Sequence, residues 1–371
     1  MHRVGVIGGG QLARMMIQPA VEMGIELRVL AEAPHSSAAL VATAIGDYRD
    51  SATVLAFAAG VDVITFDHEH VPQDVLAALV AAGATVRPEP AALAVAQDKL
   101  VMRERLSALG VPIPAWAAVG DAAALAAFIV AHDGAAVVKT PRGGYDGKGV
   151  RVVRDAAEAA DWFAAATGPL LAEELVPFRR ELAQLVARRP SGEIATWPLV
   201  ETVQTEGICT EVVAPAPGAA DLARSAANLA TSIATGLGVT GVLAVELFET
   251  DDGRLLVNEL AMRPHNSGHW TIDGAVTSQF EQHLRAVLDL PLGDPSAREP
   301  WSVMVNVVGG PVGATMPERY PQALAAQPRV KFHSYAKDSR PGRKVGHVTA
   351  SGDDLDKVRG DARAAAAFFE N

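Results

Sequence analysis

Two glutamates in one predicted hairpin are the residues of this 371-residue sequence with the clearest chemical potential. Apolar strand patterns run through residues 242–260 and are interrupted at 252–253 by Asp-Gly, a dipeptide typical of a tight β-turn. That turn places Glu246 opposite Glu259, and a longer turn still keeps the two side chains close. Like charges facing each other across strands destabilise a sheet, and a divalent cation removes the repulsion. We therefore predict a magnesium site to which Asn258 adds a neutral oxygen, with a chance acidic pair on a solvated face as the alternative.

A glycine-rich segment at residues 139–149, KTPRGGYDGKG, predicts a loop that folds over phosphate groups. Lys139 and Lys148 add positive charge, and backbone N–H groups in such a loop can point at an anion. The segment is not a Walker A loop, because no Ser or Thr follows its Gly-Lys pair, and an ordinary mobile hairpin is the alternative. Its glycines are Gly143, Gly144, Gly147 and Gly149.

A polar loop, MRPHNSGHWT at residues 262–271, directly follows the predicted hairpin. Its two histidines lack the helix and the glutamate of a zinc-protease motif, which argues against zinc. Arg263 is placed to meet a transferring phosphoryl group or an anionic substrate, and a turn whose polar groups satisfy one another is the alternative. The other polar side chains are His265, Asn266, Ser267 and His269.

Another predicted strand ends in FDHEHVP at residues 66–72. Strand alternation puts His68 and His70 on one face, with Asp67 and Glu69 on the other. Ligands gather at the carboxyl ends of parallel strands, so this rim is a candidate for function, with simple solvent exposure as the alternative.

The segment at residues 329–347 reverses the sign of the chain's overall charge. Its cations predict an anion site such as one for a phosphate monoester, and a solvated charged face is the alternative. They are Arg329, Lys331, Lys337, Arg340, Arg343 and Lys344.

The chain begins with a short strand pattern, then GGGQLA, then a helical pattern that ends at Gly24. Gly8, Gly10 and Ala13 match the spacing of a dinucleotide-binding turn, and Glu32 ends the next predicted strand. A nicotinamide dehydrogenase is therefore one hypothesis, although this motif explains nothing beyond the first 90 residues.

These motifs need a layered scaffold to bring them together. Short apolar strands alternate with helical patterns near the N-terminus, which favours a parallel sheet with covered faces. Proline-marked segments at 87–93, 111–116 and 291–300 indicate boundaries. We predict an α/β (α+β) fold with an N-terminal Rossmann-like domain at 1–95, a central domain at 96–292 and a small mixed C-terminal domain at 293–371.

The composition limits the partners. Asp and Glu number 43 against 32 Lys and Arg, and a formal charge of −11 argues against a general nucleic-acid binder. Cys209 is the single cysteine, which excludes an internal disulfide. The longest apolar runs, such as residues 122–131, are shorter than the ~20 residues of a membrane helix. Because the chain enters a strand pattern at once, we expect no signal peptide and a cytoplasmic enzyme.

The order of the motifs resembles that of ATP-grasp enzymes and, within them, of the 5-(carboxyamino)imidazole ribonucleotide synthetases of purine biosynthesis. The likeness runs through nearly the whole chain, in the order GGGQLA, QDK, VVK, GGYDGKG, VELF, VNELAMRPHNSGHWT and RPGRKVGH. It implies an ATP-grasp fold with a lid subdomain at about residues 115–176. It also implies that ATP phosphorylates bicarbonate, and that carboxyphosphate, or carbon dioxide released from it, carboxylates the amine of 5-aminoimidazole ribonucleotide. ATP, Mg²⁺ (two ions), these small-molecule substrates and a homodimer follow from the same resemblance.

The resemblance also assigns residues. The implied ATP-binding residues are Lys99, Lys139, Gly143, Gly144, Tyr145, Asp146, Gly147, Lys148, Gly149, Glu173, Glu174, Leu175, Val176, Glu181, Gln204, Asn258 and Glu259. The implied magnesium ligands are Glu246 and Glu259, and the residues around bicarbonate and the aminoimidazole are Tyr145, Asp146, Arg263 and His269. The implied ribonucleotide-binding residues are Gln11, Glu69, His70, Asn266, Ser267, Lys337, Arg343 and Lys344.

The sequence departs from the family pattern at three places. Lys99 stands where many members have Arg, residues 67–69 replace a Glu-x-Glu, and Gln204 stands where some members have His. Two alternatives to the implied reaction are another ATP-grasp ligase, such as a formate-dependent glycinamide ribonucleotide transformylase, and a non-catalytic nucleotide sensor that kept the fold.

Overall fold

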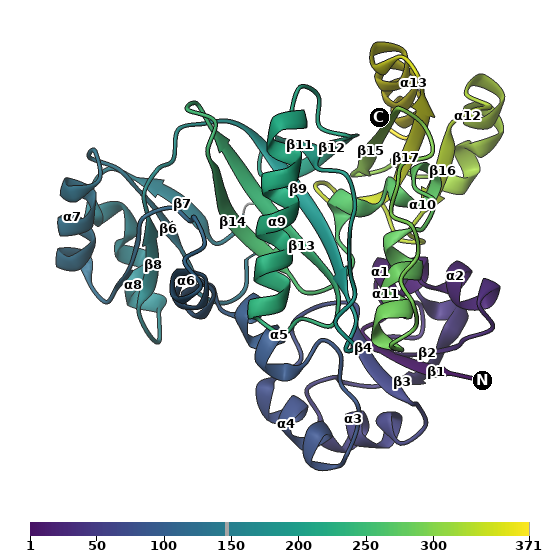
Figure 1. Ribbon diagram of the computed structural model, residues 1–371, viewed down its shortest axis with the longest axis horizontal. Coiled ribbons are helices and arrows are strands. Elements are labelled where there is room, and N and C mark those ends of the chain that lie inside the picture. Colours follow the sequence, from purple (N-terminus) through teal and green to yellow (C-terminus); the bar gives the residue numbers. More distant parts are fainter. Residues whose placement is uncertain (145–147, 371) are drawn as a thin grey trace.

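The computed structural model in Figure 1 describes residues 1–144 and 148–370. Its N-terminal part is a parallel four-stranded sheet in the order β3-β2-β1-β4, which confirms the parallel sheet expected there. The strands are β1 (Arg3–Ile7), β2 (Glu26–Ala31), β3 (Ala42–Ile45) and β4 (Val63–Phe66). The helices that follow them are α1 (Gln11–Met15), α2 (Ile17–Glu22), α3 (Ser51–Ala58), α4 (Gln73–Ala81) and α5 (Pro90–Gln97).

The prediction of a single helix that ends at Gly24 is wrong, because the structure has two short helices, α1 and α2, that meet at Met16. Pro19 lies in the first turn of α2 and has no N–H to give to the carbonyl of Met15. The break follows from that missing hydrogen bond.

A small lobe extends to the left in Figure 1 and consists of residues between β5 and β8. Its antiparallel sheet has the order β5-β8-β6-β7. The elements are β5 (Trp116–Val119), α7 (Ala122–Ala131), β6 (Ala136–Lys139), β7 (Val150–Val153), α8 (Ala160–Ala165) and β8 (Leu170–Glu173). The lobe has a hydrophobic core of its own, with Leu125, Phe128 and Val138 at its centre.

A nine-stranded sheet occupies the middle of the molecule, in the order β14-β13-β9-β11-β12-β15-β17-β16, with β10 paired to β9. The strands before residue 293 are β9 (Phe178–Arg188), β10 (Ile194–Thr196), β11 (Val200–Thr205), β12 (Ile208–Ala214), β13 (Gly241–Thr250) and β14 (Leu255–Ala261). Those after it are β15 (Trp301–Val308), β16 (Lys331–Ser334) and β17 (Lys344–Gly352). Since β15 pairs with β12, the C-terminal strands continue the central sheet.

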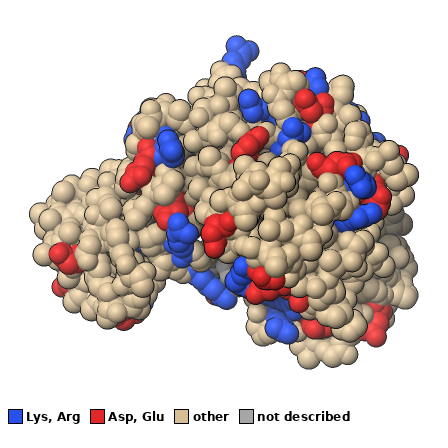
Figure 2. Space-filling model, turned by 90° about the horizontal axis from the view of Figure 1, so that it is seen from below, with Lys and Arg blue, Asp and Glu red and all other residues tan. Residues whose placement is uncertain are grey.

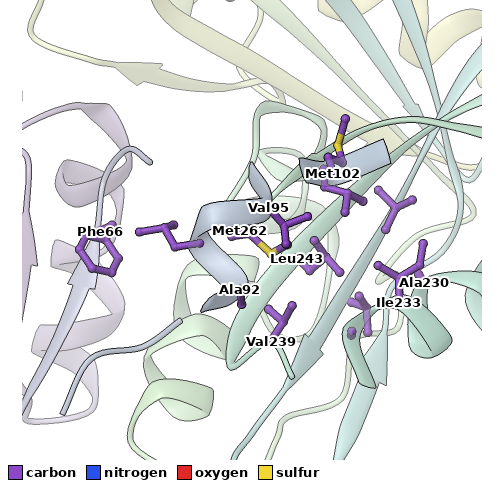
Figure 3. Packing of buried hydrophobic residues seen from close by; sticks show 14 of the residues in the cluster. Phe66, Ala92, Val95, Met102, Ala230, Ile233, Val239, Leu243 and Met262 are labelled. Atoms are coloured by element: carbon purple, nitrogen blue, oxygen red, sulfur yellow. The ribbon is translucent and has the colours of Figure 1, made fainter. Parts of the chain in front are cut away.

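The largest hydrophobic cluster joins the N-terminal sheet to the central one, as Figure 3 shows. It runs from Phe66 on β4 through Val95 on α5 and Met102 on α6 (Lys99–Ala108) to Leu243 on β13, and α9 (Ala220–Gly236) adds Ile233. The remaining helices are α10 (Thr271–Gly274), α11 (Gln279–Val287), α12 (Tyr320–Ala326) and α13 (Leu355–Ala367). Within the part of the chain described, no helix is long and apolar enough to cross a membrane.

Helix α11 links the two sheets through a buried histidine. Phe280 and Leu284 pack into the core of the N-terminal sheet. His283 is fully buried, with its Nε2 2.7 Å from Thr65 Oγ1 on β4 and its Nδ1 accepting a 3.1 Å hydrogen bond from the Val242 N–H on β13. Burial lowers the pKa of His283 to about 3, so its ring stays neutral in the folded protein.

We predict that His283→Gln makes the free energy of unfolding depend less steeply on pH below about pH 6.5. Below the unfolded-state pKa of 6.5, the unfolded chain gains a proton at this residue, whereas the folded protein gains it only near pH 3. The free energy of unfolding therefore falls through that window by up to about 1.4 kcal/mol per pH unit for this group. Urea denaturation at pH 7 and pH 5 measures the slope, with exposed His35→Gln as the control. Equal slopes in wild type and His283→Gln would contradict the prediction.

Candidate active site

A cavity of about 530 Å³ lies where the small lobe meets the central sheet. In Figure 2, Lys and Arg side chains gather along the hollow between the small lobe and the main body. Fourteen of the residues that the family resemblance assigns line this cavity. They come from the lobe and the segment after it, from α6, from β9, β11 and both hairpin strands, from the 262–271 loop and from β17. They are Lys99, Lys139, Glu173, Glu174, Leu175, Val176, Glu181, Gln204, Glu246, Asn258, Glu259, Asn266, Ser267 and Lys344.

The predicted pairing of the two glutamates is confirmed, but the predicted two-residue turn is wrong, because Thr250 pairs with Arg254 across three residues, 251–253. Glu246 on β13 lies directly opposite Glu259 on β14, and both side chains line the cavity. The register shifts immediately beyond this pair, because β14 has one extra residue, Asn258, between the partners of Glu246 and Leu247. Such a β-bulge re-aims side chains, and here two consecutive residues of β14, Asn258 and Glu259, line the same cavity.

Each carboxylate of the pair has its own positively charged or hydrogen-bonding neighbour. Glu259 lies 3.1 Å from Lys99 Nζ, and Glu246 Oε1 lies 3.1 Å from His265 Nε2. Burial alone would raise the pKa of Glu246, but the hydrogen bond and charge of His265, with Lys344 and Arg263 nearby, hold that pKa below its ordinary value. The lowered pKa suits Glu246 to remain anionic, as a ligand for a hard cation must.

The residues fit a magnesium ion that phosphate oxygens help to coordinate. Two facing carboxylates and the amide oxygen of Asn258 line one wall of the cavity. Among the described residues, no three His, Cys, Asp or Glu side chains converge on a metal position. A protein that supplies only one or two carboxylates leaves the remaining positions to water and substrate phosphates, which is the usual arrangement for Mg²⁺.

Lys139 at the end of β6 is held at the cavity by a buried ion-pair network. Its Nζ lies 2.7 Å from Glu173 Oε2 and donates a 3.1 Å hydrogen bond to Asn258 Oδ1. Glu173 also accepts a short hydrogen bond from the fully buried Arg103, whose guanidinium donates to the backbone carbonyls of Val257 and Asn258. One carboxylate thus serves two cations, so this group of three side chains carries one net positive charge beside the cavity.

Glu181 and Gln204 line the part of the cavity beside Glu246. Burial and the neighbouring charge of Glu246 raise the pKa of Glu181 to about 7, although a hydrogen bond with Gln204 opposes the shift. Apolar side chains line the cavity too, and Phe178 and Phe248 stack with ring centroids 4.6 Å apart. A mostly apolar slot beside polar groups is suited to a planar base attached to a sugar.

The loop at residues 262–271 is held by the rim at the end of β4. Glu69 accepts a 2.7 Å hydrogen bond from Arg263 Nε and a 3.2 Å hydrogen bond from the Met262 N–H. Glu69 is only 9% exposed, and its carboxylate orients Arg263, whereas the family resemblance implies a ribonucleotide contact for Glu69. His68 and His70 stack with ring centroids 5.2 Å apart, which confirms that they share a face.

His269 differs from the expectation that it lies around bicarbonate. Its side chain is fully buried and is not part of the cavity wall. The ring packs against His347 on β17, with centroids 5.1 Å apart, and its Nδ1 accepts from Gln279 Nε2 at 3.0 Å. The loop directs His265, Asn266 and Ser267 toward the cavity and His269 toward the protein interior, so residue type alone could not separate them.

The basic segment divides between two places. Lys344 lines the cavity, whereas Lys337 lines a second cavity of about 650 Å³ and donates a hydrogen bond to Gln11 on α1. Arg343 contacts the Asp338 carbonyl at 3.3 Å and is not part of either cavity wall. These residues come close to the N-terminal sheet through the contact between Lys337 and Gln11.

The N–H groups of the glycine-rich turn after β1 are bound by two acidic side chains of the protein itself. The Ala13 N–H donates to Asp67 Oδ1 at 2.8 Å, and the Gly9 N–H donates to Glu32 Oε2 at 3.2 Å. A Cβ on Gly10 would lie 2.0 Å from Asp67 Oδ2, so only glycine permits this approach. The carboxylates of Asp67 and Glu32 thus occupy N–H groups that a dinucleotide phosphate would use, which argues against the dehydrogenase hypothesis.

The predicted phosphate loop lies next to the cavity through its two ends. Lys139 is at the end of β6, and Gly149 directly precedes β7, whose Val150 lines the cavity. Gly143, Gly144 and Gly149 have φ between 71° and 80°, the left-handed region that favours glycine. Lys148 is exposed, and Tyr145, Asp146 and Gly147 lie outside the described residues.

Sequence reasoning missed two residues of the site, Arg103 and the role of His265. Arg103 follows Lys99 by one helical turn on α6, and this i, i+4 spacing is a signal that could have linked them. The sequence identifies His265 only as a polar residue of the loop, because its partner Glu246 lies on a different element.

The fold and the site together define an ATP-grasp protein. Residues 104–280 match the ATP-grasp domain, residues 1–97 match the ribonucleotide synthetase preATP-grasp domain, and residues 302–361 match the phosphoribosylaminoimidazole carboxylase C-terminal domain. The chain belongs to the family of N5-carboxyaminoimidazole ribonucleotide synthetases, which confirms the resemblance and the fold expected from the sequence.

Relatives and solved structures cover almost the whole chain. It is 53% identical over 376 residues to N5-carboxyaminoimidazole ribonucleotide synthase of Mycobacterium tuberculosis, covering 99% of this chain and 88% of that one. The Corynebacterium ammoniagenes enzyme is 50% identical, with 100% and 92% covered. The Thermus thermophilus synthetase structure has a TM-score of 0.89 at 37% identity, with 99% of both chains covered. The Aspergillus clavatus synthase, solved with ADP and 5-aminoimidazole ribonucleotide, has a TM-score of 0.88 at 31% identity, with 99% and 98% covered.

We predict that Glu181→Gln stabilises the protein more at pH 8 than at pH 5. The pKa of Glu181 is about 7 in the folded protein and about 4.5 when unfolded, so this group's stabilising contribution is lost as pH rises through that window. The amide removes the buried charge next to Glu246. Melting temperatures of both proteins at the two pH values measure the difference, and an equal shift at pH 5 and pH 8 would speak against it.

Proposed function

We propose that this protein uses ATP and bicarbonate to carboxylate the exocyclic amine of 5-aminoimidazole ribonucleotide, with release of ADP and phosphate. One observation carries the proposal: a single cavity contains Lys99, Lys139 and the acidic hairpin together with Asn266 and Lys344, in a chain 53% identical to a synthase named for this product. The names of the relatives favour this reaction over that of a formate-dependent transformylase.

The ATP end of the cavity is the part next to the small lobe. Lys99 and Lys139 supply positive charge for the phosphates, and the network with Glu173 and Arg103 keeps Lys139 in place. The base would contact the 173–176 segment and the apolar slot, with Glu181 at the ribose. Phosphoryl transfer depends on positioned charge more than on a covalent catalyst, and this residue set provides that charge.

Magnesium would be held by Glu246, Glu259 and Asn258. When bound, it neutralises phosphate oxygens and favours departure of ADP. Lys99 and His265 keep both carboxylates oriented in the protein itself.

The reaction then needs two displacements. A bicarbonate oxygen attacks the γ-phosphorus, the bond to the β-phosphate oxygen breaks, and ADP and carboxyphosphate form. The amine nitrogen next attacks the carboxyl carbon, phosphate leaves and the nitrogen loses one proton. Arg263, oriented by Glu69, is placed to bind the anions, and Tyr145 and Asp146 are proposed around the same substrates. Enclosure by the 143–149 loop would protect carboxyphosphate from water.

The ribonucleotide end of the cavity is proposed at the polar loop and the basic segment. Asn266, Ser267 and Lys344 line the cavity there, and Gln11, Lys337 and Arg343 are proposed to hold the phosphate group. We also infer a cytoplasmic homodimer, as the family resemblance implies, which light scattering of the purified protein tests.

We predict that ADP release requires both bicarbonate and 5-aminoimidazole ribonucleotide. The amine consumes the activated carboxyl group, so turnover stalls when either substrate is absent. A coupled assay for ADP, with each component omitted in turn, measures the requirement. Rapid ADP release without the ribonucleotide would point to a different acceptor, and ATP binding without any ADP would point to a nucleotide sensor.

We predict that Glu259→Ala lowers kcat for ADP formation by about 10²-fold or more, because it removes one carboxylate of the magnesium site. The side chain is 43% exposed, so the fold should persist with little change in melting temperature. Asp251→Asn, at the exposed tip of the same hairpin, is the matched control. Full activity of Glu259→Ala would remove the metal assignment.

A further inference from the structure

Gln279, the first residue of α11, clamps the polar loop from behind the cavity. Its side chain is fully buried. Its Oε1 accepts from the His265 N–H at 2.8 Å, and its Nε2 donates to the His265 carbonyl at 2.8 Å and to His269 Nδ1 at 3.0 Å. A backbone N–H can only donate and a carbonyl can only accept, so the two contacts to His265 fix which end of the amide is which.

The clamped residue is the one that touches the acidic hairpin. With its backbone held on both sides by Gln279, His265 directs Nε2 to Glu246 Oε1 at 3.1 Å and Nδ1 to Ser267 Oγ at 2.9 Å. A continuous series of contacts therefore runs from α11 through His265 to Glu246. None of these contacts requires Gln279 to reach the cavity.

The surroundings leave the amide little freedom. The Gln279 N–H donates to Thr271 Oγ1 at 2.9 Å, and that hydroxyl donates to the Gly268 carbonyl at 2.6 Å. A Cβ on Gly268 would lie 2.5 Å from Gln279 Oε1 and 2.3 Å from Leu185 Cδ2, so the loop packs directly on the amide. Glu69 holds the beginning of the same loop, and Gln279 holds its middle.

We propose that Gln279 is a positioning residue for the reaction: by clamping the backbone of His265, it sets the geometry of the His265–Glu246 contact at the cavity. The inference rests on the proposed function, and it adds a residue that touches neither substrate nor metal. Its contribution is geometric, because misplacement of a catalytic group by about 1 Å can cost about 10²-fold in rate.

The same helix supplies a matched control. Gln282 is also fully buried on α11, and its amide clamps one backbone residue in the same two-way manner. It accepts from the Gly293 N–H at 2.7 Å and donates to the Gly293 carbonyl at 2.8 Å, in the segment that leads to β15. Gln279→Met and Gln282→Met therefore remove equivalent pairs of backbone hydrogen bonds, of which only one pair belongs to the site, and Gln279→Met also removes the hydrogen bond to His269 Nδ1.

The experiment compares the two variants by steady-state kinetics, melting temperature and crystal structure. We expect both melting temperatures to fall, and that of Gln279→Met by at least as much, because it loses one more buried hydrogen bond. We expect kcat for ADP formation to fall by about tenfold or more in Gln279→Met, with a smaller change in KM for ATP, and to stay within about twofold of wild type in Gln282→Met. In the crystal structure of Gln279→Met, the 3.1 Å contact between His265 Nε2 and Glu246 Oε1 should lengthen or be lost.

An unchanged contact between His265 and Glu246 in Gln279→Met, or equal losses of kcat in the two variants, would overturn the proposal. If Gln279→Met does not fold, Gln279→Asn keeps an amide but withdraws it by one methylene, and Gln282→Asn becomes its control. Should wild type release no ADP with bicarbonate and 5-aminoimidazole ribonucleotide, the proposed function fails, and the crystal structures alone then decide the role of Gln279.

Discussion

The site depends on holding two carboxylates side by side. Glu246 and Glu259 face each other across one hairpin, and each is compensated by a group from a separate part of the chain. Lys99 comes from α6, and His265 comes from the loop that follows the hairpin. Because neither partner belongs to the hairpin itself, the acidic pair is tolerable only in the assembled tertiary structure. Folding therefore brings Lys99 and His265 from distant parts of the chain to the glutamates on β13 and β14.

Buried carboxylates and a buried amide fix the positions of the charged and polar groups around the cavity. Glu69 orients Arg263, Glu173 is shared by Lys139 and Arg103, and Gln279 spans the backbone of one loop residue. Each of these groups would be costly to bury alone, and each is satisfied by two or more partners. Helix α11 is central to this arrangement, since His283 on the same helix links β4 to β13. The continuous central sheet adds rigidity, because β17, which begins at Lys344, belongs to the same hydrogen-bonded sheet as the hairpin strands β13 and β14.

Local rules predicted the parts of this structure that are encoded over short distances. The Asp-Gly turn and strand alternation placed Glu246 near Glu259, although the turn has three residues and the exact pairing also needs the extra residue Asn258. The family resemblance named most of the cavity wall. The extra residue at Asn258 could not be foreseen, since a β-bulge depends on how the partner strands pack. Arg103 and Gln279 look like ordinary polar residues of helices, and only their long-range partners show that they are buried and hold segments next to the cavity. His269 fails for the complementary reason, because its sequence neighbours line the cavity while its own ring faces inward.

The turn after β1 shows that a glycine motif indicates a backbone geometry, and that the motif alone does not identify the bound group. Glycines allow close approach to a helix N-terminus, and the spacing of Gly8, Gly10 and Ala13 meets that requirement. What approaches here is the carboxylate of Asp67, which follows β4 in the same parallel sheet. The interaction ties the first helix to the rim whose next acid, Glu69, holds Arg263. A glycine pattern typical of cofactor binding thus fixes one edge of the active site. The group that occupies the turn here is the side chain of Asp67, which another part of the chain supplies.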